Sequence, residues 1–256
     1  MPTSAERRHL AVIPARGGSK RLPRKNVIDF FGRPILAFTI EAAKKAGLFS
    51  RVLVSTEDEE IARIARHFRA DVDRRPPELG TDGSTVVDVC VELLERLATS
   101  GNRYDTLTVL YATAPLRTAL DIRQTHALLE PSRCDFSLAA SEFLQPVHQA
   151  LHLRADGRAE PVFSELFEKR ASDVGRYAAG NGSTYCADVS AFLRTRSFSG
   201  GPLRAHLMPV DRSVDIDTAD DLELARFYGK PLYGRGAKKP ARRKTTPAGK
   251  RKSRRK

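Results

Sequence analysis

The sequence is poor in the residues that cross-link small folds or bind structural metals. It contains no tryptophan, two methionines and three cysteines among 256 residues. Cys90, Cys134 and Cys186 are far apart without CxxC spacing, so they predict reduced core thiols in a cytoplasm rather than disulfides or a metal site. No run approaches the ~20 apolar residues of a membrane span, and residues 1–8 lead into an apolar strand rather than a signal peptide. We therefore expect a cytoplasmic protein without membrane contact.

Two common nucleotide-binding motifs are also absent. The chain has neither a GxxxxGK(S/T) P-loop nor a GxGxxG dinucleotide fingerprint, and it contains no internal repeat. These absences remove the main support for a kinase, a GTPase or a dehydrogenase.

Acidic residues are missing from the C-terminal segment. The formal net charge is +13, but twelve basic residues fall within residues 235–256, which leaves the rest of the chain at +1. Without apolar periodicity this segment cannot bury enough surface to fold. We expect a domain of residues 1–230 followed by a disordered basic tail, residues 231–256. Weak binding of polyanions, or nuclear targeting, is the functional alternative for the tail.

The body alternates apolar β-rich runs with helical patterns, and 41% of the chain is apolar, enough for one core. Strands are expected at His9–Pro14, Arg51–Thr56, Thr106–Tyr111, Asp135–Ala140, Ser183–Val189 and Arg204–Val210. Helices are expected at Pro34–Ala46, Asp58–Phe68, Ser84–Leu97, Ile122–Glu130, Ser190–Thr195 and Thr218–Tyr228. Regularity fails between Ser141 and Gly180. The alternation predicts an α/β fold: a Rossmann-like, mostly parallel sheet with helices on both faces and ligands beyond the carboxyl ends of the strands.

A basic loop that contains paired glycines, residues 15–26, follows the first expected strand. Gly17 and Gly18 allow backbone N–H groups to approach an anion closely. Five cations crowd the same segment without an acid: Arg16, Lys20, Arg21, Arg24 and Lys25. Like charges repel one another, and a bound polyphosphate relieves that repulsion. Most charge runs are solvated surface, but the position after a strand favours a loop that grips a nucleotide triphosphate.

Asp215 and Asp217 stand at a strand-to-helix junction. Alternate residues of an extended segment face the same side, so the two carboxylates can converge on one hard cation. The structural alternative is an ordinary helix N-cap at Asp217 or Thr218. Beside a triphosphate loop, the pair predicts Mg²⁺ as cofactor, because Mg²⁺ bridges carboxylates and substrate phosphates.

These motifs resemble the acylneuraminate cytidylyltransferases, the CMP-sialic acid synthetases. The matching loop is Ile13-Pro14-Ala15-Arg16-Gly17-Gly18-Ser19-Lys20 with Pro23 and Lys25-Asn26. Further matches follow in the same order: Val54-Ser55-Thr56-Glu57-Asp58, Arg75-Pro76-Pro77-Glu78-Leu79, Ala112-Thr113-Ala114-Pro115-Leu116-Arg117, Asn181-Gly182 and Asp215-Ile216-Asp217-Thr218. The resemblance spans residues 9–228. It implies a nucleotidyltransferase-type fold and transfer of CMP from CTP to the anomeric hydroxyl of a nonulosonic acid, with release of pyrophosphate.

The resemblance also implies a role for individual residues. Arg16, Lys20 and Lys25 would grip the triphosphate as catalytic cations, and Asp215 and Asp217 would bind Mg²⁺. The nucleotide-binding set would be Ala15, Gly17, Ser19, Asn26, Arg75, Ser84 and Thr85. The sugar-binding set would be Tyr111, Thr113, Arg170, Arg176 and Asn181, with an arginine to meet the sugar carboxylate. The irregular stretch 141–180 would be the dimerisation insertion of a homodimer.

The motifs leave the sugar open. Tyr111-Ala112-Thr113-Ala114 resembles the pseudaminic-acid branch, whereas Asn181-Gly182-Ser183-Thr184-Tyr185 resembles the sialic and legionaminic branches. Ala179 stands where relatives often carry arginine. An enzyme for an eight-carbon 2-keto sugar acid is a close alternative, and a polyanion-binding protein that acts through its tail is a distant one. The near-neutral body and the lack of a groove-reading motif argue against the latter.

Overall fold

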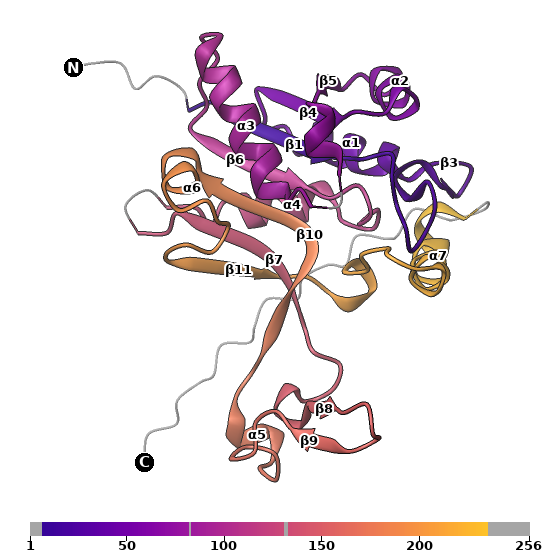
Figure 1. Cartoon of the computed structure of the whole chain (residues 1–256), viewed down its shortest axis with the longest axis vertical. Coiled ribbons are helices and arrows are strands. Elements are labelled where there is room, and N and C mark those ends of the chain that lie inside the picture. Colours follow the sequence, from indigo (N-terminus) through magenta and orange to yellow (C-terminus); the bar gives the residue numbers. More distant parts are fainter. Residues whose placement is uncertain (1–6, 82, 131–132, 235–256) are drawn as a thin grey trace, which may run out of the picture.

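One seven-stranded sheet organises the computed structural model, which describes residues 7–81, 83–130 and 133–234 (Figure 1). Its order is β11-β7-β10-β6-β1-β4-β5. The strands are β1 (His9–Pro14), β4 (Arg51–Thr56), β5 (Asp71–Arg74), β6 (Thr106–Leu110), β7 (Phe136–Glu142), β10 (Ala178–Asp188) and β11 (Leu203–Leu207). All neighbours pair in parallel except β10, which is antiparallel to both β6 and β7. The mostly parallel sheet is therefore confirmed.

Helices cover both faces of the sheet. Successive side chains of β1 point to opposite faces, and Leu10 and Val12 join one buried cluster while Ala11 and Ile13 join another. The first cluster includes α3 (Val86–Thr99) and α6 (Val189–Thr195). The second includes α1 (Ile35–Ala46), α2 (Glu59–His67) and α4 (Ala119–His126). None of the helices among the described residues is long and apolar enough to cross a membrane.

A third buried cluster fixes the end of the chain. It joins α7 (Ala219–Tyr233) to the small hairpin β2 (Asp29–Phe30) and β3 (Arg33–Pro34), with Val214 and Ile216 in between. The helix expected to end at Tyr228 runs on to Tyr233, because the Tyr233 ring packs edge-on against Phe38 with ring centroids 4.9 Å apart. The expected boundary after residue 230 thus falls inside α7. The basic residues 235–256 lie outside the described residues.

The structure also differs from the expectation at other elements, among them α4, β5 and the strand expected at Ser183–Val189, which is β10 and begins at Ala178. The helix expected at Ile122–Glu130 is α4, which starts three residues earlier and ends at His126. It starts early because Thr118 and Asp121 form a reciprocal capping box at its N-terminus. Strand β5 was not expected at all, because its sequence Asp-Val-Asp-Arg looks like a polar loop. Its buried Asp73 accepts a hydrogen bond from Ser55 at 2.7 Å, which compensates for the burial of the carboxylate.

The stretch 141–180, which the sequence left irregular, contains some regular structure of its own. Strands β7 and β10 run out of the sheet and carry a small unit that stands away from the body (Figure 1). The unit contains η3 (Val147–Gln149), β8 (Leu151–Leu153), β9 (Ala159–Pro161) and α5 (Ala171–Val174). We call residues 143–177 the arm.

Candidate active site

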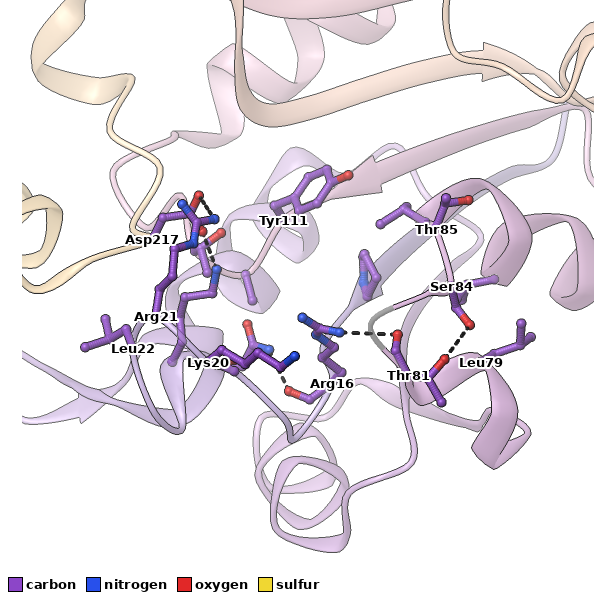
Figure 2. A pocket seen from close by; sticks show the side chains of 18 of the residues that line it. Arg16, Lys20, Arg21, Leu22, Leu79, Thr81, Ser84, Thr85, Tyr111 and Asp217 are labelled. Atoms are coloured by element: carbon purple, nitrogen blue, oxygen red, sulfur yellow. Dashed lines mark hydrogen bonds and ion pairs between the residues drawn. The ribbon is translucent and has the colours of Figure 1, made fainter. Parts of the chain in front are cut away.

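A cavity of about 450 Å³ opens where β1 and β6 end, as expected for a ligand site in a parallel sheet. Eleven of the residues predicted from the sequence line it: Arg16, Ser19, Lys20, Lys25, Asn26, Arg75, Ser84, Thr85, Tyr111, Thr113 and Asp217. Figure 2 shows Thr81, Ser84 and Thr85 on one flank and Arg21 and Asp217 on the other. Arg16 and Lys20 lie between the two flanks (Figure 2). The cavity is thus elongated, with cations at its centre.

The cations of the loop converge with Asp217. Lys25 Nζ lies 2.5 Å from Asp217 Oδ1, and Arg21 Nη2 lies 2.6 Å from Asp217 Oδ2. Burial alone would raise the pKa of Asp217, but the hydrogen bonds and charges of these two cations lower it below its usual value. Arg16 reaches the other flank, where its guanidinium donates to the Thr81 carbonyl at 3.2 Å. The loop therefore spans the cavity from one flank to the other.

Asp215 sits deeper than Asp217, behind Thr113. Its carboxylate accepts a short hydrogen bond from the Thr113 hydroxyl, and burial, together with the negative charge of Asp217, raises its pKa. Gly182 explains how the carboxylate fits: a Cβ at this position would overlap it, and the φ of Gly182 is +67°. Glycine is thus required there by both space and backbone conformation.

Arg75 and the start of α3 form the flank farthest from Asp217. Arg75 is 7% exposed and donates to the carbonyls of Ser55 and Leu79, and burial lowers the pKa of its guanidinium. The Ser84 hydroxyl donates to the Glu78 carbonyl at 2.8 Å, and the Thr85 hydroxyl caps α3. These polar groups have fixed directions, which suits recognition of a planar polar ligand.

Internal contacts shape the glycine loop. The Gly17 N–H donates to Glu57 Oε1 at 2.7 Å, and a Cβ on Gly17 would collide with Asp58. Asn26 Nδ2 donates to the Arg16 carbonyl at 2.9 Å, which closes the loop on itself. Ala15 is fully buried and Gly17 is bound internally, and neither lines the cavity. Their position supports a role in loop geometry rather than in ligand contact.

Three predicted sugar ligands are not brought to this cavity. Arg170 and Arg176 are exposed on the arm, where Arg176 pairs with Glu142. Asn181 is 8% exposed, and its amide donates to Ser213 Oγ at 3.1 Å. Its side chain is therefore used inside the protein, and it lines no part of the cavity.

Several residues of the site were not predicted from the sequence, among them Arg21, Thr81 and Arg117. Arg21 was counted among the loop cations but not assigned to the site, although its charge and its place in the loop were enough to predict that it lines the cavity. Arg117 is 2% exposed and donates to the Ser183 and Tyr111 carbonyls, and burial lowers its pKa to about 10. It holds the end of β6 against β10 behind the cavity. A lone arginine after Pro-Leu gives no sequence signal for such burial.

Asp215 and Asp217 are the carboxylates that would hold a magnesium ion together with substrate ligands. Within the described residues no group of three or more His, Cys, Asp or Glu forms a metal site. Mg²⁺ is commonly held by one or two carboxylates together with substrate phosphates. Burial raises the pKa of Asp215, and the negative charge of Asp217 raises it further; a bound cation would offset the contribution of that charge.

A mostly parallel sheet with a cation-lined cavity at its carboxyl edge, with Asp217 on the cavity wall and Asp215 behind Thr113, is the arrangement expected of a nucleotidyltransferase. A family model described as cytidylyltransferase matches residues 10–135. The chain is 32% identical to the pseudaminic acid cytidylyltransferase of Campylobacter jejuni over 224 residues, 87% of this chain and 97% of the relative. It is also 32% identical to the CMP-N,N'-diacetyllegionaminic acid synthase of Legionella pneumophila over 225 residues, 85% of this chain and 94% of the relative. The chain therefore belongs to the acylneuraminate cytidylyltransferase family, a family of CTP-dependent nucleotidyltransferases.

A solved structure supports the fold. A CMP:2-keto-3-deoxy-manno-octonic acid synthetase, solved with CTP, superposes with a TM-score of 0.64 at 18% identity, over 86% of this chain and 97% of that one. At this identity the match concerns the nucleotidyltransferase fold alone.

Proposed function

We propose that this protein transfers CMP from CTP to the anomeric hydroxyl of a nonulosonic acid and releases pyrophosphate. The observation that carries the proposal is one cavity lined by Arg16, Lys20 and Lys25, with Asp217 on its wall in contact with Lys25. In the reaction, a bond forms between the sugar oxygen and the α-phosphorus, and the bond from that phosphorus to the leaving pyrophosphate breaks. Fixed cations stabilise the charge that develops on the phosphate oxygens.

We propose that each substrate occupies its own end of the cavity. We propose that cytosine lies on the flank of Arg75, Ser84 and Thr85, where buried polar groups of fixed direction can meet the edge of a base. The sugar then lies toward Tyr111 and Thr113, on the side of the two carboxylates. Binding the triphosphate between these ends brings the α-phosphorus and the sugar hydroxyl together, which removes much of the entropic barrier.

Magnesium is the cofactor we propose, held by Asp215 and Asp217. When bound, it neutralises charge on the phosphate oxygens. In the structure the Asp217 carboxylate is paired with Lys25 and Arg21. A triphosphate competes for the same two cations and thereby releases Asp217.

We further propose a homodimer formed through the arm, as the family resemblance implies. The arm carries large exposed apolar side chains, a typical property of interface surfaces: Phe143, Leu144, Leu151, Leu153, Val162, Phe163 and Tyr177. In a dimer, Arg170 or Arg176 would approach the sugar carboxylate in the partner's cavity. Light scattering tests the dimer. Mixing Lys20→Ala with Arg176→Ala protein tests the shared site, because only mixed dimers would then regain a complete cavity.

Steady-state pyrophosphate release tests the proposed activity. The protein is incubated with CTP, Mg²⁺ and one sugar acid at a time: pseudaminic, legionaminic, sialic and the eight-carbon 2-keto acid. Turnover with a nine-carbon acid, and much less with the eight-carbon acid, supports the proposal. A preference for the eight-carbon acid would overturn the substrate class, and no turnover with any acid would overturn the proposal itself. We place the reaction in the cytoplasm, where three buried unpaired thiols are typical.

A further inference from the structure

The segment that carries Asp215 and Asp217 has no regular secondary structure of its own. It lies between η4 (Val210–Arg212) and α7. At its downstream end, the Ile216 N–H donates to the Thr113 carbonyl at 2.9 Å, and the Ile216 side chain is fully buried. Its upstream end is held by the backbone turn of η4 and by side-chain contacts of Arg212 and Ser213. The course of the chain toward the two carboxylates therefore depends in part on how Arg212 is held.

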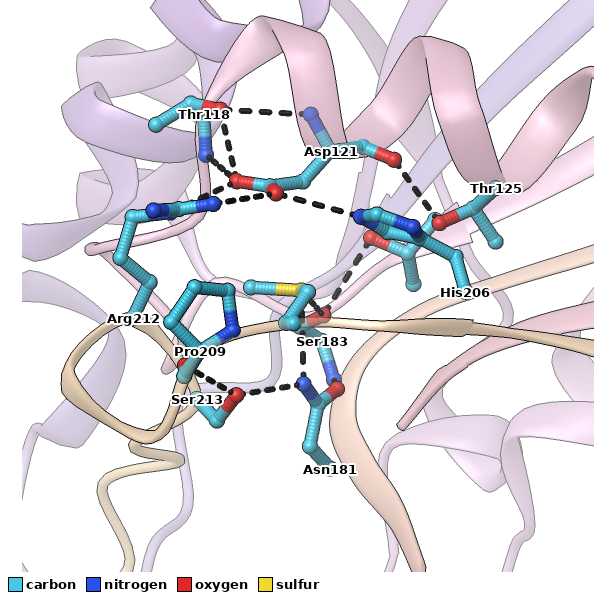
Figure 3. Close-up of polar contacts among 11 residues, drawn as sticks. Thr118, Asp121, Thr125, Asn181, Ser183, His206, Pro209, Arg212 and Ser213 are labelled. Atoms are coloured by element: carbon cyan, nitrogen blue, oxygen red, sulfur yellow. Dashed lines mark hydrogen bonds and ion pairs between the residues drawn. The ribbon is translucent and has the colours of Figure 1, made fainter. Parts of the chain in front are cut away.

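Arg212 is held by a completely buried carboxylate on α4 (Figure 3). Its Nη2 lies 2.8 Å from Asp121 Oδ1 and its Nε lies 3.1 Å from Asp121 Oδ2, a bidentate pair. His206 of β11 adds a contact at 3.3 Å from Nε2 to Asp121 Oδ1. One carboxylate thus ties α4 to β11 and to the residue from which the Asp215 segment begins.

Helix capping alone does not explain Asp121. Reciprocal boxes of Thr-x-x-Asp also start α3, with Asp88, and α7, with Asp221. Asp88 caps its helix while exposed to solvent, so a cap of this kind needs no burial. Throughout residues 7–81, 83–130 and 133–234, neither Asp88 nor Asp221 has an arginine partner within salt-bridge distance. Burying a carboxylate is costly unless it is paired, so the pairing with Arg212 is what allows the burial of Asp121.

Asp121 and Arg212 are both charged at neutral pH. Burial alone would raise the pKa of Asp121, but hydrogen bonds from Arg212 and Thr118 bring it down to about 2. A second brace acts from β10, where Asn181 holds Ser213 by a 3.1 Å hydrogen bond (Figure 3). The first residues of the segment are thus fixed from two elements that do not line the cavity.

We propose that Asp121 is a positioning residue for the metal-binding carboxylates. Through Arg212 it sets the course of residues 213–217, so that Asp217 faces the cavity and Asp215 stands beside it. The inference rests on the proposed function, because it assigns a supporting residue to the same magnesium site.

Two variants and a matched control test this role. Asp121→Asn keeps the shape of the side chain and removes its charge, and Arg212→Lys keeps the charge and removes the bidentate geometry. Asp88→Asn removes an equivalent capping carboxylate from α3. Three quantities are measured on the full chain: the Mg²⁺ concentration for half-maximal turnover, the KM for CTP at saturating Mg²⁺, and Mn²⁺ affinity with a non-hydrolysable CTP analogue.

We expect Asp121→Asn and Arg212→Lys to raise the half-maximal Mg²⁺ concentration and to weaken Mn²⁺ binding by about tenfold, the usual effect of losing a group that orients metal ligands. The KM for CTP should stay within about twofold. Combining the two changes should add little, because both remove the same contact. Asp88→Asn should lower the melting temperature without changing the metal requirement.

Folded variants with the metal requirement of the wild type would overturn the inference and leave Asp121 as a buried helix cap. If Asp121→Asn does not fold, the metal requirement of Arg212→Lys tests the inference, because this variant leaves the capping box of α4 intact. If the wild type turns over no sugar acid, the proposed function fails. The Mn²⁺ titration then still decides whether Asp121 positions the carboxylates.

Discussion

Replacing Lys25 with methionine should raise the affinity of the nucleotide-free protein for a divalent cation by about tenfold. A cation that binds Asp217 must displace Lys25 at 2.5 Å and Arg21 at 2.6 Å. A hydrogen bond to a charged group contributes about 1.5–3 kcal/mol, and about 1.4 kcal/mol corresponds to a factor of ten. The Asp217 side chain is 32% exposed and Arg21 remains in the variant, so the lower end of that range applies.

A titration with Mn²⁺, followed by the electron paramagnetic resonance signal of the free ion, measures this affinity. In the wild type, a non-hydrolysable CTP analogue should strengthen Mn²⁺ binding beyond the affinity of the analogue alone, because the triphosphate takes Lys25 and Arg21 away from Asp217. In Lys25→Met the nucleotide-free affinity should rise and the gain from the analogue should shrink. Lys45→Met is the matched control: it removes one positive charge from the surface of α1, and the affinity should not change. A folded Lys25→Met protein whose nucleotide-free Mn²⁺ affinity equals that of the wild type would refute the idea that Lys25 competes with the metal ion for Asp217.

Three further outcomes are expected. Asp215→Asn and Asp217→Asn should each lower kcat at least ~10²-fold with the fold retained, since each removes about 3 kcal/mol of transition-state stabilisation; near-wild-type pyrophosphate release by both at saturating Mg²⁺ would reject the metal site. Burial, helped by the neighbouring charge of His9, lowers the pKa of His126 from 6.5 to about 4. The contribution of the neutral His126 ring to the free energy of unfolding is therefore fully present above pH 6.5, and about 3 kcal/mol of it is lost as the pH falls toward 4. Urea unfolding from pH 7 to pH 4 should show a flatter pH dependence for His126→Gln, and an unchanged dependence would contradict the assignment. Truncation after residue 234 should abolish retention on heparin at unchanged melting temperature, whereas truncation after residue 228 should cost about 2 kcal/mol or more of unfolding free energy, because it removes the aromatic end of α7.

The sequence predicted those parts of the fold that have a strong local pattern. The strands at His9–Pro14 and Arg51–Thr56 have their predicted bounds, because each is a short apolar run closed by a turn. Boundaries that depend on capping were less accurate, as for α4, whose start is fixed by a reciprocal contact between Thr118 and Asp121. Strand β5 was missed because its polar side chains are satisfied by partners from distant segments. Nothing in a four-residue polar run identifies such partners.

The candidate site likewise has features that the local sequence predicts and features that depend on contacts between distant segments. The basic loop could be predicted because its charges are adjacent in the sequence, and Arg16, Lys20 and Lys25 do line one cavity. The contact between Lys25 and Asp217 joins residues 192 positions apart, and only the fold reveals that the two predicted groups meet. The support for Asp215 could not be predicted either, since it depends on the absence of a side chain at Gly182.

Phosphorus NMR of the complete reaction tests the central claim most directly, because it reports which phosphorus of CTP is attacked. With CTP, Mg²⁺ and the preferred nonulosonic acid, we predict loss of the triphosphate signals and matching growth of one CMP-sugar phosphodiester signal and one pyrophosphate signal. Formation of CDP or of inorganic phosphate as the primary product would place the attack elsewhere on the triphosphate. That result would contradict nucleotidyl transfer in this cavity.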